Sequence, residues 1–207
     1  MKWAVIWSMG AEQVKLPLPP ADLASRALLL TRIPGPLFRV HRITLEALYF
    51  GKGGKSRFDD PRGKYGVLYA ALRPEAAFAE VFLRQLSQML VEEEALAQRA
   101  LSEIAVNSVC CVNLTAQGLR RISCDNRISD EVPYDTPGLW SRALYEHPQK
   151  PGGILYRSRH NPQFTCVAVF SGIEKRLTLK KTTPLLHTSL RAWTGRQLSR
   201  YGLALIS

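Results

Sequence analysis

The side chains most capable of chemistry in this sequence are one glutamate and two arginines. Glu80 lies in an alanine-rich segment, where it is either a solvated residue paired with Arg84 or a carboxylate at the mouth of a pocket. Arg39 stands between apolar neighbours, and Arg57 precedes two aspartates that could neutralise it. Because arginine is rarely buried without a partner, Arg39 indicates an ion pair or a bound anion.

A serine and a glycine-rich loop are weaker candidates. Ser158 has no GxSxG context, so we do not expect an activated nucleophile there. The loop Gly51–Ser56 (GKGGKS) resembles a P-loop, but Tyr49 occupies the position of the first glycine that such a loop needs. A flexible basic loop is the expected structure, and hydrolysis of nucleoside triphosphates is not expected.

The elements that must position these residues can be read from the apolar pattern. We expect strands near residues 37–43, 65–72, 108–114, 153–156 and 164–170. A helix should begin at Pro74 and run to Leu86, and another should cover residues 136–145. Residues 91–105 are expected to be helical or irregular, and the proline-rich residues 11–36 to form a leader that packs on the domain. This order predicts a single α+β domain.

Composition and charge narrow the choice of function. The 207 residues carry 28 Lys and Arg against 17 Asp and Glu, and nine of the cations lie between Arg157 and Arg200 with only Glu174 opposing them. This excess favours an anionic partner: nucleic acid, a phosphate-bearing ligand or an acidic protein. We expect the four cysteines to be free thiols, with no zinc site, secretory signal or transmembrane helix.

Four short motifs, in this order, resemble the RES domain family. They are SRFDDP from Ser56, YGVLYA from Tyr65, PEAAFAE from Pro74 and GGILYRSRH from Gly152. The resemblance spans roughly residues 37–170. It implies a fold similar to that of ADP-ribosyltransferase toxins, with mixed or antiparallel sheets flanked by helices. We expect an N-terminal extension at 1–27, the RES domain at 28–185 and a basic C-terminal extension at 186–207 packed on the domain.

The resemblance also implies a function. RES proteins are toxins of bacterial toxin–antitoxin pairs, neutralised by a partner of the Xre type, and they consume NAD⁺ by phosphorolysis or hydrolysis. The implied protein is cytoplasmic, needs no metal or resident cofactor, uses NAD⁺ as substrate and inorganic phosphate as a possible co-substrate, and meets DNA only through the antitoxin complex. One alternative is an ADP-ribosyltransferase that modifies a protein, and a second is a non-enzymatic basic module that binds nucleic acid.

The family is named after an arginine, a glutamate and a serine, which the match places at Arg57 or Arg39, Glu80 and Ser158. Glu80 would stabilise the positive charge that develops on the ribose as the nicotinamide leaves. Ser158 would orient Glu80 or a ribose hydroxyl and would form no covalent bond.

The remaining implied roles concern substrate binding. Arg39 and Arg57 would hold the pyrophosphate of NAD⁺, because a guanidinium can donate two hydrogen bonds to a phosphate at once. Tyr69 would stack on the cationic nicotinamide ring. Tyr65 and His160 are neighbours of these motifs, and for each a structural role is the expected one.

Overall fold

The computed structural model describes residues 15–84 and 89–206. Its strands are β1 (Leu30–Arg32), β2 (Leu37–Arg42), β3 (Val67–Ala71), β4 (Leu90–Glu92), β5 (Arg99–Val106), β6 (Cys110–Leu114), β7 (Gly153–Arg157), β8 (Thr165–Phe170), β9 (Leu177–Pro184) and β10 (Ala204–Ile206). Its α-helices are α1 (Pro74–Phe82), α2 (Glu93–Ala97), α3 (Gln117–Arg121), α4 (Arg127–Asp130), α5 (Asp135–Tyr145) and α6 (Thr188–Arg200).

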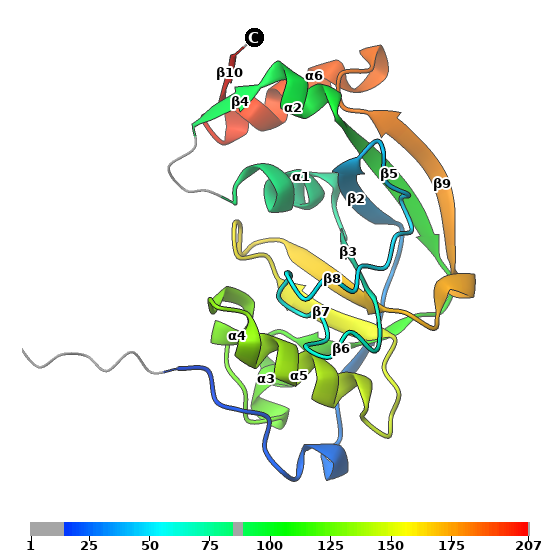
Figure 1. The fold of residues 1–207 in the computed structure, drawn as a ribbon, viewed down its shortest axis with the longest axis vertical. Coiled ribbons are helices and arrows are strands. Elements are labelled where there is room, and N and C mark those ends of the chain that lie inside the picture. Colours follow the sequence, from blue (N-terminus) through cyan, green and yellow to red (C-terminus); the bar gives the residue numbers. More distant parts are fainter. Residues whose placement is uncertain (1–14, 85–88, 207) are drawn as a thin grey trace, which may run out of the picture.

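Eight of the strands form one curved mixed sheet in the order β1-β6-β7-β8-β3-β2-β5-β9 (Figure 1). The pair β6–β7 is parallel and the other neighbours are antiparallel. β2 and β3 pair at a single position, Phe38 opposite Ala71, and then diverge. Gly51 pairs with Val67 beyond this point, so the segment after β2 returns to the edge of β3. The divergence opens the sheet near its centre.

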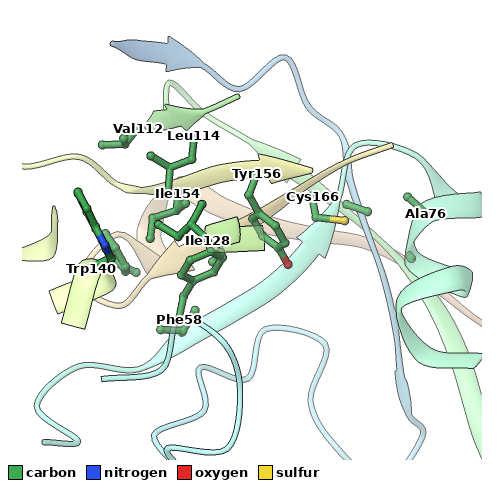
Figure 2. Close-up of a cluster of buried hydrophobic side chains, with 14 of the residues drawn as sticks. Phe58, Ala76, Val112, Leu114, Ile128, Trp140, Ile154, Tyr156 and Cys166 are labelled. Carbon is green, nitrogen blue, oxygen red and sulfur yellow. The ribbon is translucent and has the colours of Figure 1, made fainter. Parts of the chain in front are cut away.

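Helices cover one face of the sheet, and apolar residues from loops cover part of the other. In Figure 1, α1, α4 and α5 lie on the same side of the sheet. The core on this side contains the aromatic residues Phe58, Trp140 and Tyr156, together with Ile128 from α4 (Figure 2). Phe58 packs edge-to-face on Tyr156, with ring centroids 4.9 Å apart. The opposite face is covered in part by Leu48, Phe50 and Ile173.

α1 begins as predicted, at Pro74, and two residues connect it to the end of β3. Proline suits this position because its fixed backbone angle fits the first turn and its missing N–H has no partner there in any case. Ala76, Ala77 and Ala79 are buried, and such small side chains let the helix approach the sheet closely. The helix ends at Phe82, and Leu86, where we expected it to end, lies outside the described residues.

The prediction for residues 91–105 was wrong in its second half. Only Glu93–Ala97 is helical, and Arg99–Val106 forms strand β5. Alanine, glutamate and leucine favour a helix locally, but pairing with β2 on one side and β9 on the other overrides that preference. The other predicted strands and the helix at 136–145 are confirmed to within two residues at each end. The α+β class is confirmed as well.

Candidate functional site

A pocket of about 310 Å³ opens where β2 and β3 diverge, beside α1. Its wall also includes the end of β7, the loop that follows β7, Ser129 of α4 and Tyr134, which follows α4. The residues that line it are Phe38, Arg39, Val40, Lys55, Ser56, Arg57, Tyr69, Ala70, Ala71, Ala77, Glu80, Val81, Arg84, Ser129, Tyr134, Tyr156, Arg159 and His160. Four of the five predicted site residues are therefore in one wall, and the fifth, Ser158, lies directly behind it.

Ser158 holds the carboxylate of Glu80 in place. Its hydroxyl donates a hydrogen bond of 2.6 Å to Oε1 of Glu80 and accepts bonds from the backbone N–H groups of His160 and Asn161, both at 3.2 Å. Ser158 is 1% exposed, so water does not replace these contacts. Arg84 donates to the main-chain oxygen of Glu80 at 3.0 Å, so the expected i,i+4 partner binds the backbone of Glu80.

Arg57 is buried and held by main-chain and aromatic groups. Its Nη1 donates to the carbonyl oxygen of Glu131 at 2.8 Å, and its guanidinium lies 4.8 Å from the centre of the Tyr134 ring. Burial lowers the pKa of Arg57. No carboxylate forms a salt bridge with this arginine among the described residues. Its neighbours Asp59 and Asp60 have other partners.

Tyr69 projects from β3, and its hydroxyl both accepts and donates a hydrogen bond. The oxygen accepts a bond from the N–H of Phe58 at 2.8 Å and donates to Asp59 at 2.9 Å. Asp59 in turn accepts bonds from the N–H groups of Lys55 and Ser56, which shapes the loop that carries Arg57. Burial, with the Asp59 carboxylate adding to it, holds the pKa of Tyr69 well above its ordinary value. Its phenol therefore stays neutral and its ring is rigid.

Arg39 lies where β2 leaves β3. Its Nη1 donates to the carbonyl oxygens of Ala47 and Tyr49, both at 2.9 Å, and burial lowers the pKa of Arg39 to about 10. Two carbonyl groups, which carry no full charge, thus stand where an ion pair was predicted, and the alternative of a bound anion stays a prediction. In the described part of the chain no acidic residue pairs with it.

The pocket is strongly cationic. Five Lys or Arg residues line it, and Glu80 is the single carboxylate in the lining set. Burial lowers the pKa of His160, although the nearby Glu80 opposes this shift, so the imidazole is neutral at pH 7. Burial likewise raises the pKa of Tyr156 and Cys166 well above their ordinary values. The arrangement is suited to an anionic ligand that also has a region able to bear positive charge beside Glu80.

Several residues that line the pocket were not predicted from the sequence. Ser129, Tyr134 and Arg159 line the pocket and were not singled out. Tyr134 comes from a polar turn, where an aromatic residue is an available but weak signal. Tyr65 is absent from the pocket lining, because it stacks on Tyr145 with ring centroids 4.0 Å apart. Tyr65 thus has the structural role expected of it, whereas His160, for which a structural role was also expected, lines the pocket.

Two features are absent from residues 15–84 and 89–206. No three or more His, Cys, Asp or Glu side chains gather there in a way that could hold a metal ion. None of the helices described is both long enough and apolar enough to cross a membrane. The four cysteines are unbridged, as predicted.

Residues 31–190 match the RES domain, and the chain therefore belongs to the RES domain family. A curated relative, "Probable toxin y4kH" of Sinorhizobium fredii, is 32% identical over 74 residues. That match covers 36% of this chain and 58% of the relative's length.

Among solved structures, a chain of the M. tuberculosis MbcT–MbcA toxin–antitoxin complex has a similar fold. The TM-score is 0.64 at 19% identity, over 84% of this chain and 98% of that one. The resemblance inferred from the four motifs and the predicted fold class are both confirmed.

Proposed function

We propose that the chain is the toxin of a bacterial toxin–antitoxin pair and that it depletes NAD⁺ by cleaving the bond between nicotinamide and ribose. The observation that carries the proposal is the Glu80 carboxylate, fixed at 2.6 Å by Ser158 in a pocket whose other charged residues are cationic. A dinucleotide with a pyrophosphate and a cationic ring has the matching charges. The toxin named in the relative and the complex formed by the structural neighbour agree with this role.

The reaction needs few groups. The C–N bond between ribose C1′ and nicotinamide breaks, and its electron pair leaves with nicotinamide, which becomes neutral. The positive charge that develops on the ribose is stabilised by Glu80, whose orientation Ser158 maintains. An oxygen of inorganic phosphate or of water then forms the new bond to C1′. A phosphate yields ADP-ribose 1″-phosphate, whereas water yields ADP-ribose and releases a proton.

The remaining pocket residues would bind and orient NAD⁺. Arg57 is buried and Arg39 half-buried, and neither has a carboxylate partner among the described residues, which suits both cations to the pyrophosphate. The rigid Tyr69 ring would stack on nicotinamide. The basic surface would attract an acidic antitoxin of the Xre type, a contact that brings DNA near only through that partner.

Phosphorus NMR of NAD⁺ incubated with the purified protein, with and without phosphate, tests the proposal. We expect loss of NAD⁺ and a new ADP-ribose phosphate signal that needs phosphate, or ADP-ribose alone if water is the nucleophile. Glu80→Gln should lower kcat by roughly a hundredfold or more, because its contact strengthens in the transition state. Its melting temperature should stay close to that of the wild type, since glutamine can still accept the bond from Ser158.

Two further observations complete the test. Expression in a bacterial host should arrest growth, and Glu80→Gln or co-expression of the antitoxin should relieve the arrest. Intact NAD⁺ in every sample would contradict the small-molecule reaction. Transfer of labelled ADP-ribose to a protein would then support the alternative of an ADP-ribosyltransferase.

A further inference from the structure

One side chain of the pocket wall has no role in the reaction described above. Ser129, on α4, is 1% exposed, and its Oγ has no hydrogen-bond partner among residues 15–84 and 89–206. Serine inside a helix commonly donates to the carbonyl oxygen four residues earlier. Here that carbonyl, of Asp125, accepts from the N–H of Ile128 and the thiol of Cys124. A buried hydroxyl without a partner costs free energy, so the feature calls for an explanation.

The surroundings of Ser129 indicate what its partner would be. Arg57 bonds to the carbonyl of Glu131, two residues further along the chain, and lies over Tyr134. Ser129, Arg57 and Tyr134 all line the same pocket. One Nη1 bond is the hydrogen bond that the structure gives to the Arg57 guanidinium, so most of its N–H donors remain available to a ligand. A group that accepts hydrogen bonds and carries negative charge fits both side chains.

We infer that Ser129 and Arg57 together bind a phosphate group of the ligand, with the Ser129 hydroxyl as donor. The guanidinium supplies the charge and a planar pair of donors, while the hydroxyl supplies a third donor whose position the buried helix fixes. The burial of both residues strengthens these bonds because water is excluded. The Ser129 hydroxyl, which has no partner among the described residues, would gain one when the ligand binds.

This inference takes the identity of the ligand, one phosphate of the NAD⁺ pyrophosphate, from the proposed function. In this reading α4 belongs to the binding site, and Ser129 contributes to ligand affinity and has no part in bond cleavage. Glu80 and Ser158 are supplied by α1 and the loop after β7, so the two functions depend on different elements. Removing the Ser129 hydroxyl should therefore raise KM for NAD⁺ and leave kcat nearly unchanged.

Two measurements on Ser129→Ala test the inference, with Ser199→Ala as the matched control on the exposed side of α6. The first is isothermal titration calorimetry with inorganic pyrophosphate at about 0.15 M salt, which screens binding to the general basic surface. We expect about tenfold weaker binding for Ser129→Ala and wild-type binding for the control. The second is steady-state kinetics with NAD⁺, where KM should rise by a similar factor for Ser129→Ala alone.

The melting temperature separates a binding role from a structural one. Ser129→Ala removes a buried hydroxyl without a partner, so its melting temperature should equal or exceed that of the wild type. Equal pyrophosphate affinity of Ser129→Ala and wild type would overturn the inference, as would the absence of pyrophosphate binding by the wild type. If the wild type leaves NAD⁺ intact but Ser129→Ala weakens pyrophosphate binding, the proposed function fails and the phosphate site stands.

Discussion

Ser158 and Glu80 share a hydrogen bond but have different roles in the site. Glu80 lies in the pocket wall, whereas Ser158 lies behind it and acts through Glu80. Ser158 also ties the loop after β7 to this carboxylate, because its oxygen accepts the N–H groups of His160 and Asn161. One buried hydroxyl thus links the position of the carboxylate to the shape of the loop that carries Arg159 and His160 into the pocket lining.

Replacing Ser158 with alanine should therefore affect both stability and turnover. Two backbone N–H groups and one carboxylate oxygen lose their partner, so we expect the free energy of unfolding to fall by about 1–3 kcal/mol. The carboxylate loses its fixed orientation, so kcat for NAD⁺ should fall roughly tenfold or more. Denaturant unfolding and steady-state kinetics measure the two effects, with the exposed Ser25→Ala as control. An unchanged kcat with reduced stability would make Ser158 purely structural.

Two substitutions of Tyr69 separate the role of its ring from the role of its hydroxyl. Tyr69→Phe keeps the ring but deprives the Phe58 N–H and the Asp59 carboxylate of a partner, so the free energy of unfolding should fall by about 1–3 kcal/mol. KM for NAD⁺ should stay close to the wild-type value. Tyr69→Leu removes the ring as well and should raise KM by roughly threefold or more. Equal KM values for the two variants would argue against stacking.

At the scale of elements, the helices and strands that could be predicted from the sequence are those whose residues are buried in a regular pattern. β3 and β8 are apolar runs bounded by turns, and α1 begins at a proline, so each could be recognised locally. β5 could not be, because its residues favour a helix and only its neighbours in the sheet make it a strand. β9 was also missed, since it lies at the edge of the sheet and most of its side chains are exposed.

The pocket likewise contains residues that could be recognised from local sequence and residues that depend on tertiary packing. Glu80, Arg57 and Tyr69 could be found because motifs carry them, and their meeting in one wall followed from the family resemblance. Ser129 could not be found, because an isolated serine in a polar segment gives no signal until the packing of α4 is known. The choice between Arg39 and Arg57 as the family arginine stays open, since both line the pocket.

At Gly118, α3 packs closely on Asn113 of β6. A Cβ on Gly118 would lie 1.7 Å from the carbonyl oxygen of Asn113, so Gly118→Ala forces the helix away from the strand. We expect the free energy of unfolding to fall by about 2–3 kcal/mol or more. Gly195→Ala is the matched control, because a Cβ at that position in α6 meets no atom within 4 Å.

The control substitution, Gly195→Ala, should change the free energy of unfolding in the opposite direction. Alanine favours a helix over glycine, so Gly195→Ala should raise the free energy of unfolding by about 0.5–1 kcal/mol. Thermal or urea unfolding of both variants measures the difference. A Gly118→Ala protein as stable as the wild type would mean that α3 does not pack on β6 as described.

For the whole molecule, two histidines make stability depend on pH. Burial lowers the pKa of both His41 and His160 below the ordinary value of 6.5. The unfolded chain therefore binds protons more readily near pH 6, and the stability that the neutral histidines retain above about pH 6.5 is lost as the pH falls through their folded-state pKa values. We expect the melting temperature to drop between pH 7.5 and 5, by differential scanning fluorimetry.

The contribution of the two histidines to the pH dependence of the melting temperature can be separated from that of the carboxylates. A double variant, His41→Gln with His160→Gln, should show a shallower fall in melting temperature with acid than the wild type, whatever its absolute stability. His187→Gln, at an exposed helix cap, controls for the removal of a histidine. Identical pH slopes in the wild type and the double variant would contradict the prediction.

The order of the strands in the sheet also determines when the pocket can be completed during translation. Glu80 and Ser158 are 78 positions apart, and β3 needs β8, a much later strand, as its neighbour in the sheet. A nascent chain that has left the ribosome only as far as α5 contains Arg57 and Glu80 but not the groups that hold the carboxylate in place. Such long-range pairing forms late in folding. Chains whose β8 has not yet left the ribosome therefore lack the assembled site, and the proposed toxicity begins only after Ser158 and β8 have emerged.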